Sequence, residues 1–226
     1  MKKVKKGLCL CGLLYTFILF QILGINFLHR QEAVETGQIR AEKPRIAITF
    51  DDGPSAKYTP QLLDGLKERN VKASFFVIGK MAEENPKLIQ REKEEGHLIG
   101  NHTYNHVDIS KISDEDAVLE IQKTNQVIEK VTKDNVEYLR APFGSWKKNL
   151  VGRMNVFPVA WSVDPLDWTT ENADEIVNKV VTEVKENDII LLHDCYQSSV
   201  DAALRIIDIL RKEGYEFVTV DKLILE

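Results

Sequence analysis

Short apolar runs typical of buried strands alternate with amphipathic helical segments along most of the 226-residue chain. The strand-like runs lie near residues 45–50, 73–78, 97–99, 137–139, 159–163, 189–192 and 216–220. Between them are helix-start signals such as Pro60 at a first helical position and Ser113 before three acidic residues. This alternation predicts a parallel sheet covered by helices, either a barrel or an open doubly wound sheet. Residues 144–158 break the pattern, because Gly152 and Pro158 interrupt any long helix.

The N-terminal segment predicts a membrane anchor. Four lysines within residues 2–6 precede an apolar run, Gly7 to Leu28, long enough to span the roughly 30 Å hydrocarbon layer as a helix. The lysines place the N-terminus in the cytoplasm and the rest of the chain outside. A cleaved signal peptide, giving a secreted protein, is the alternative, although no convincing small-x-small cleavage site follows Leu28. We therefore predict an anchor over residues 1–30, a tether over 31–44 and one catalytic domain over 45–226.

Charge and cysteine content exclude two classes of protein. Residues 1–30 hold five of the 30 Lys and Arg residues and none of the 35 Asp and Glu residues, so the remainder is strongly acidic. A nucleic-acid partner is therefore not expected, since phosphate binding requires a basic face. Only Cys195 lies outside the apolar segment, so no disulfide can form within the folded domain.

Reactive side chains follow the ends of the predicted strands. They are Asp51 and Asp52, His102 and His106, Arg140, Asp164 and Asp167, and His193. The carboxyl ends of parallel strands meet on one face of such folds, and that face carries their active sites. The placement predicts an enzyme.

The adjacent aspartates require a positive partner, because two neighbouring carboxylates repel each other. The H-T-Y-N-H stretch spaces His102 and His106 by four, so in a helical turn both imidazoles would point to one side. Two imidazoles and one carboxylate are a common ligand set for a catalytic divalent ion. If Asp52 is the ligand, Asp51 remains ionised as a free base beside the metal.

Five ordered stretches are together similar to the motifs of the polysaccharide deacetylase family, also called the NodB homology family. They are T-F-D-D-G-P (49–54), H-T-Y-N-H (102–106), R-A-P-F (140–143), D-P-L-D-W (164–168) and L-L-H (191–193). The resemblance covers residues 45–223. It implies a distorted (β/α) barrel of about seven parallel strands, which favours the barrel over the open sheet.

The resemblance also implies a metal site and an acid–base pair. Asp52, His102 and His106 would hold a divalent ion, commonly zinc, with cobalt, nickel and manganese as alternatives. The ion would lower the pKa of its water and polarise the substrate carbonyl. Asp51 would be the general base, and His193 the general acid that protonates the leaving amine.

The remaining implied roles support these groups. Arg140 would orient Asp51, through a guanidinium suited to a bidentate grip on a carboxylate, and Asp167 would orient His193. The backbone N–H of Phe143, which stands where the family often has tyrosine, would bind the oxyanion. Trp168 and Leu191 would wall a small apolar pocket for the acetyl methyl group.

Purely structural roles stay open for several of these residues. Arg140 could instead be a surface salt-bridge residue, and Trp168 and Leu191 could be core residues. Asp164 has a turn-capping and a site-supporting interpretation. His97 and Cys195 are interpreted as packing residues.

These observations predict a metal-dependent N-deacetylase acting on N-acetylated amino sugars of an extracellular polysaccharide, with peptidoglycan N-acetylglucosamine as the first hypothesis. Chitin-like oligomers, exopolysaccharides and acetylxylan are alternative substrates. A non-catalytic carbohydrate-binding relative is an alternative from another class. Phosphoryl transfer through an aspartyl nucleophile leaves the histidines unexplained.

Overall fold

The computed structural model describes residues 43–150 and 152–225. The predicted membrane segment and nearly all of the predicted tether lie outside these residues. Within the described ranges, no helix is long and apolar enough to cross a membrane.

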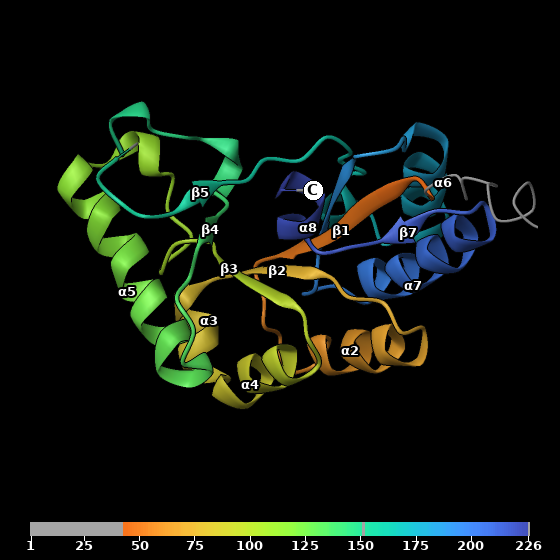
Figure 1. Cartoon of the computed structure of the whole chain (residues 1–226), viewed down its shortest axis with the longest axis horizontal. Helices are drawn as coiled ribbons and strands as arrows, with labels where there is room; N and C mark the ends of the chain where they lie inside the picture. The colour runs from red at the N-terminus through yellow and green to blue at the C-terminus, as the bar shows by residue number, and fades with distance from the viewer. Residues whose placement is uncertain (1–42, 151, 226) are drawn as a thin grey trace, which may run out of the picture. The chain divides into compact units, whose positions relative to one another are not determined.

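Seven parallel strands form one sheet, as predicted from the alternation (Figure 1). They are β1 (Arg45–Asp51), β2 (Ser74–Val77), β3 (Leu98–Asn101), β4 (Tyr138–Leu139), β5 (Phe157–Pro158), β6 (Ile189–His193) and β7 (Glu216–Phe217). The order is β5-β4-β3-β2-β1-β6, and β7 pairs with the first two residues of β1. Beyond β5, Val163 bridges to Ile190 of β6. Residues 157–163 therefore pair with β4 at one end and with β6 at the other.

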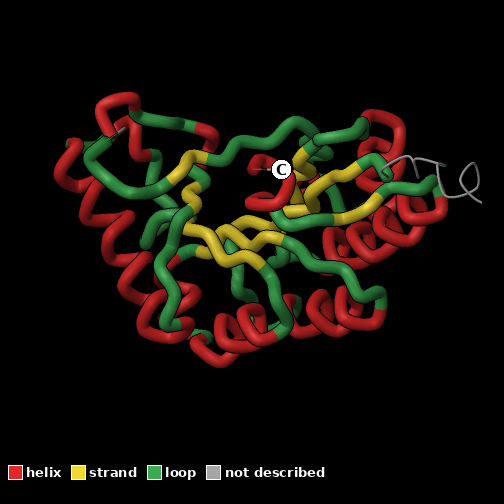
Figure 2. Tube along the Cα trace, viewed as in Figure 1, coloured by secondary structure: helices red, strands yellow, loops and turns green. Residues whose placement is uncertain are grey.

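Helices alternate with the strands along the chain (Figure 2). They are α2 (Thr59–Glu68), α3 (Gly79–Glu84), α4 (Pro86–Glu94), α5 (Asp114–Thr132), α6 (Ala173–Glu183), α7 (Gln197–Lys212) and α8 (Val220–Leu225). The predicted start signals are confirmed: Pro60 lies in the first turn of α2, and the Ser113 hydroxyl accepts a hydrogen bond from the Asp116 N–H at the start of α5.

Two predicted strands differ from the structure: the strand predicted at 159–163 lies instead at Phe157–Pro158, and the strand predicted at 216–220 ends at Phe217. At 159–163, the Val159 and Ala160 carbonyls accept hydrogen bonds from the Arg140 guanidinium instead of continuing a ladder. At 216–220, the chain leaves the sheet after Phe217, and Val220 begins α8 with its N–H bonded to the Ser74 hydroxyl. The short helix α3 was not predicted.

The alternation along β1 separates the core from the site. Ile46, Ile48 and Phe50 pack with the helices in the main core, whereas Ala47 belongs to a second cluster with Val220 of α8. Thr49 and Asp51 share the face of Ala47, because side chains alternate along a strand. The inner face thus carries apolar packing against α8 at its amino end and polar residues at its carboxyl end.

Candidate metal and acid–base site

Asp52, His102 and His106 converge just past the carboxyl ends of β1 and β3. The Oδ1 atom of Asp52 lies 3.4 Å from Nε2 of His102 and 3.3 Å from Nε2 of His106. One ligand atom from each of the three residues lies within 4.8 Å of the others. The structure therefore brings together the three residues that the resemblance assigned to a metal.

The protein fixes which nitrogen His102 presents to this cluster. Its Nδ1 lies 2.7 Å from the carbonyl oxygen of Arg140. A carbonyl can only accept, so Nδ1 carries the proton and Nε2 keeps its lone pair toward Asp52. A backbone partner of this kind commonly orients metal-binding histidines.

The histidines do not share a helical turn, so the predicted reason for their convergence is wrong. Residues 102–108 form a loop in which Thr103 and His106 have positive φ values of 63° and 54°. Such values are uncommon for residues other than glycine, and the loop keeps them through hydrogen bonds. The Thr103 N–H donates to Asn101 Oδ1, and the Val107 N–H donates to Thr103 Oγ1.

Glu120 of α5 also holds this loop, and the sequence analysis did not identify it. Its carboxylate accepts hydrogen bonds from the N–H groups of Tyr104 and Asn105, at 3.0 and 2.8 Å, and from the Asn105 side chain at 2.7 Å. The sequence offered no signal for this role, because Glu120 is one of many acidic residues on a long helix.

The three residues fit a divalent cation. Oδ1 of Asp52 is buried and has no hydrogen-bond partner in the described part of the chain, although it faces two imidazole nitrogens. Burial raises the pKa of Asp52, but its close contact with His102 and the charges of the surrounding histidines outweigh burial and hold the pKa below its usual value. Burial lowers the pKa of His106, which favours the neutral, metal-binding form. A carboxylate and two neutral imidazoles suit zinc and similar ions.

Asp51 is paired with a fully buried Arg140. The guanidinium Nη1 donates to Oδ1 of Asp51 at 2.8 Å and to the hydroxyl of Thr49 at 2.7 Å. Its Nε and Nη2 reach the carbonyls of Val159 and Ala160. Arg140 is therefore not a surface residue, and its contact with Asp51 involves one nitrogen rather than the predicted bidentate grip. The free Oδ2 of Asp51 lies 3.7 Å from Nε2 of His102, beside the three-residue cluster.

His193, the last residue of β6, lies beside Asp51, the last residue of β1. The strand register pairs Asp51 with His193 directly. The Asp167 carboxylate accepts from His193 twice, at Nδ1 (2.8 Å) and at the backbone N–H (2.9 Å), and it also accepts from the Ser199 hydroxyl. Burial lowers the pKa of His193, but the hydrogen bond and charge of Asp167 outweigh it and raise the pKa to about 9. Ser199, at the start of α7, is a second residue that sequence reasoning missed.

The three predicted substrate-binding residues differ in exposure. Leu191 is buried and pairs in register with Thr49, one step below His193 on the inner face. Trp168 is 58% exposed and Phe143 is 68% exposed, so neither is a core residue. Phe143 has φ 61°, and its ring contacts His106 edge-on at 4.8 Å between centroids. Phe143 thus lies beside the cluster.

The residues without assigned roles have local structural ones. Oδ1 of Asp164 accepts from the Leu166 N–H, which is a turn cap. His97 is packed against Phe75, and its Nδ1 accepts from the Ala73 N–H. Burial raises the pKa of the Cys195 thiol to about 12, as expected for an inert packing residue.

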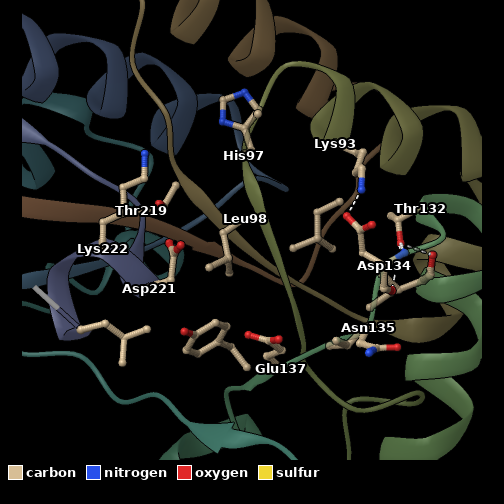
Figure 3. A pocket seen from close by; sticks show the side chains of 16 residues that line it. Lys93, His97, Leu98, Thr132, Asp134, Asn135, Glu137, Thr219, Asp221 and Lys222 are labelled. Carbon is tan, nitrogen blue, oxygen red and sulfur yellow. Dashed lines mark hydrogen bonds and ion pairs between the residues drawn. The ribbon is translucent and has the colours of Figure 1, made fainter.

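A pocket of about 360 Å³ lies away from the candidate site, beside the starts of β3 and β4. Figure 3 shows it with His97, Asp221 and the Lys93–Asp134 ion pair around it. Because His97 directly precedes β3 and Asp134 precedes β4, the pocket lies at the amino end of the sheet, opposite the cluster.

Comparisons with known proteins agree with this geometry. A family model described as "Polysaccharide deacetylase" matches residues 38–159. A peptidoglycan-N-acetylglucosamine deacetylase of Bacillus cereus is 40% identical over 209 residues, covering 86% of this chain and 97% of the relative. Peptidoglycan-N-acetylglucosamine deacetylase PgdA of Listeria monocytogenes is 38% identical over 79% of this chain, which spans only 38% of that relative. The structure of peptidoglycan deacetylase PdaC from Bacillus subtilis matches with a TM-score of 0.78 at 37% identity, covering 80% of this chain and 90% of that one.

Proposed function

Because this chain belongs to the polysaccharide deacetylase family, we propose that it is a metal-dependent hydrolase that removes N-acetyl groups from peptidoglycan N-acetylglucosamine. One observation carries the proposal. The buried, unpartnered Oδ1 of Asp52 faces two imidazole nitrogens, and a buried carboxylate and a charged histidine flank it on β1 and β6. The names of the similar proteins support peptidoglycan as the substrate.

Asp52, His102 and His106 would hold the ion, with zinc proposed from the ligand types and cobalt, nickel and manganese as substitutes. When bound, the ion polarises the acetyl carbonyl and makes water more acidic.

Asp51 acts as the general base. Water forms a C–O bond with the carbonyl carbon of the acetyl group while its proton passes to the free Oδ2 of Asp51. Arg140 holds Oδ1 at 2.8 Å and keeps Oδ2 directed toward His102 and the cluster.

His193 acts as the general acid. Its raised pKa keeps Nε2 protonated at neutral pH, while Asp167 holds Nδ1. As the C–N bond breaks, the sugar nitrogen takes the Nε2 proton, so the products are acetate and a free amine. The proton that Asp51 received returns to solvent or to His193 before the next turnover.

Phe143, Leu191 and Trp168 complete the proposed site. The backbone N–H of Phe143, beside His106, would donate to the oxygen that becomes negative. Leu191 and Trp168 would contact the acetyl methyl group.

The proposed catalytic domain is a distorted barrel that lies outside the cell and is attached to the membrane by the N-terminal segment. The pairing of residues 157–163 with both β4 and β6 supports closure of the sheet into a ring. The lysine-flanked apolar run over residues 7–28 supports a single-pass anchor that presents the domain to the wall.

Acetate release tests the proposal. The full chain in detergent is stripped of metal, reloaded with zinc or cobalt, and assayed on peptidoglycan and on chitin oligomers. We expect acetate release that is lost on chelation, restored by metal, and reduced at least about 100-fold in Asp51→Asn. Asp208→Asn, in a surface ion pair with Arg69, is the control that retains activity. Tight glycan binding without acetate from any substrate would instead identify a non-catalytic carbohydrate-binding protein.

A further inference from the structure

A groove of about 590 Å³ runs beside the His193–Asp167 pair. One wall is formed by residues 168–173, which directly follow Asp167, and the other by residues 196–201, which closely follow His193. Tyr58, just before α2, lines the end of the groove. None of the roles assigned above uses this space, apart from the contact proposed for Trp168.

Hydrogen bonds tie the two walls together. The Ser199 hydroxyl donates to Asp167, and the Ser198 hydroxyl donates to the Thr170 carbonyl at 3.3 Å. Within the second wall, the Gln197 side chain donates to Asp201 at 2.9 Å. The groove is therefore preformed, and a ligand would not need to order its walls.

Exposed aromatic rings make the groove suitable for a sugar. Trp168 is 58% exposed and Tyr196 is 42% exposed, and both line it. A pyranose ring has an apolar C–H face and polar edges, so it can cover an aromatic face while its hydroxyls meet polar groups. Thr170, Gln197 and Ser198 supply such groups along the walls.

The charge of the groove selects among sugars. Glu171 and Asp201 line it, and no lysine or arginine is among its lining residues in the described chain. Of the nearby cations, Lys57 donates to the Tyr58 hydroxyl and Arg205 is paired with Asp174. Carboxylates disfavour an acidic sugar such as muramic acid and favour a cationic one. A free sugar amine can carry a positive charge, whereas the amide of an N-acetylated sugar cannot.

We propose that this groove is a subsite for an N-unsubstituted amino sugar, a glucosamine unit in the same glycan strand as the unit being deacetylated and separated from it by the intervening muramic acid. The inference rests on the proposed function, because glucosamine is the product of that reaction. On this proposal, a unit that is already deacetylated strengthens binding of the glycan strand. The enzyme would then act faster on partly deacetylated strands than on fully acetylated ones.

Binding of a glucosamine tetramer tests the subsite without catalysis, because this oligomer carries no acetyl group to release. Titration calorimetry compares it with the N-acetylglucosamine tetramer on the full chain carrying Asp51→Asn. The test variant is Glu171→Gln with Asp201→Asn, and the matched control is Glu213→Gln at the far end of α7. Carboxamides preserve shape, and thermal unfolding confirms that each variant is folded.

We expect the double variant to bind the glucosamine tetramer about tenfold more weakly, with the N-acetylated tetramer changed less than about twofold. The control should match the parent for both. Affinity for glucosamine should also fall with added salt and above the pKa of the amine. Equal weakening of both tetramers, or no change in either, would overturn the subsite.

Failure of the proposed function gives a different result. If no glycan releases acetate but glucosamine binding depends on Glu171 and Asp201, the subsite holds and the catalytic proposal fails. If acetate is released but the double variant binds glucosamine normally, the catalytic proposal holds and the subsite is wrong.

Discussion

His193, the partly buried last residue of β6, and His97, buried just before β3, belong to the same sheet, yet their pKa values shift in opposite directions. Asp167 lies 2.8 Å from Nδ1 of His193 and raises its pKa to about 9. Nε2 of His97 lies 4.0 Å from the nearest oxygen of Glu95, and burial lowers the pKa of His97 to about 4. Burial disfavours charge in both cases, and only a firmly held carboxylate reverses it.

The same contrast separates the carboxyl end of the sheet from the helical layer. The buried charge of Arg140 meets Asp51, Thr49 and two carbonyls. Glu92 on α4 is fully buried, and neither of its oxygens has a hydrogen-bond partner among the described residues. The site thus holds charge with partners from several strands, whereas the helical layer stabilises neutral forms.

Removing the carboxylate that distinguishes the two histidines should have the largest effect. In Asp167→Asn, His193 loses its negative partner, so its pKa falls from about 9 toward or below its ordinary 6.5. His193 then loses its proton at a lower pH, so the alkaline limb of the kcat profile should shift to lower pH. The value of kcat should fall about 10²- to 10⁴-fold. The pH dependence of acetate release measures this. An unmoved alkaline limb would show that His193 is not the acid.

Replacing the unpartnered carboxyl of Glu92 should stabilise the domain. Burial, followed by the charge of Asp194, raises the pKa of Glu92 well above its ordinary 4.5. Folding therefore opposes ionisation, and stability falls as pH rises above 4.5, where only the unfolded chain ionises freely. Glu92→Leu should raise the free energy of unfolding by about 1–3 kcal/mol near pH 7–8, and by less near pH 5. Urea unfolding measures both values.

The control for Glu92 lies on the same helix. Glu94 is exposed, so Glu94→Leu should change stability by less than about 0.5 kcal/mol at either pH. A destabilised Glu92→Leu variant would indicate a structural partner for this carboxyl.

Changing the neutral histidine should affect folding but not catalysis. His97→Phe removes the acceptor for the buried Ala73 N–H and should cost about 1–2 kcal/mol of stability. The alkaline limb of activity should stay in place, because His97 lies at the other end of the sheet. A shifted limb would contradict the assignment of that limb to His193.

The smallest effect is expected from Ser199, which contacts the His193–Asp167 pair through its hydrogen bond to Asp167. Ser199→Ala removes one hydrogen bond to Asp167 but leaves both contacts with His193. Losing one such bond should reduce kcat up to about tenfold and move the alkaline limb by less than about one pH unit. Ser199→Thr, which restores the hydroxyl, should recover most of the rate. No recovery would point to a packing defect.

Sequence patterns predicted the strands and the grouping of the candidate site residues better than the connections between them. Alternation revealed the seven strands, and their ends located Asp51, Asp52, Arg140 and His193, because strand direction alone brings such residues together. The supporting residues Glu120 and Ser199 were missed, since a helical glutamate or serine has no pattern that reveals a distant backbone partner. The spacing of His102 and His106 suggested a helix, but tertiary hydrogen bonds hold a loop there instead.

The central position of β1 determines when the site can form. β1 comes first in the described chain, yet it pairs with β6 and β7 near the other end, and Thr49 bonds to Ile190, 141 residues later. Contacts so distant in sequence close slowly. Asp51 and His193 therefore stay apart during folding until β6 pairs with β1. The candidate site is therefore one of the last parts of the domain to assemble.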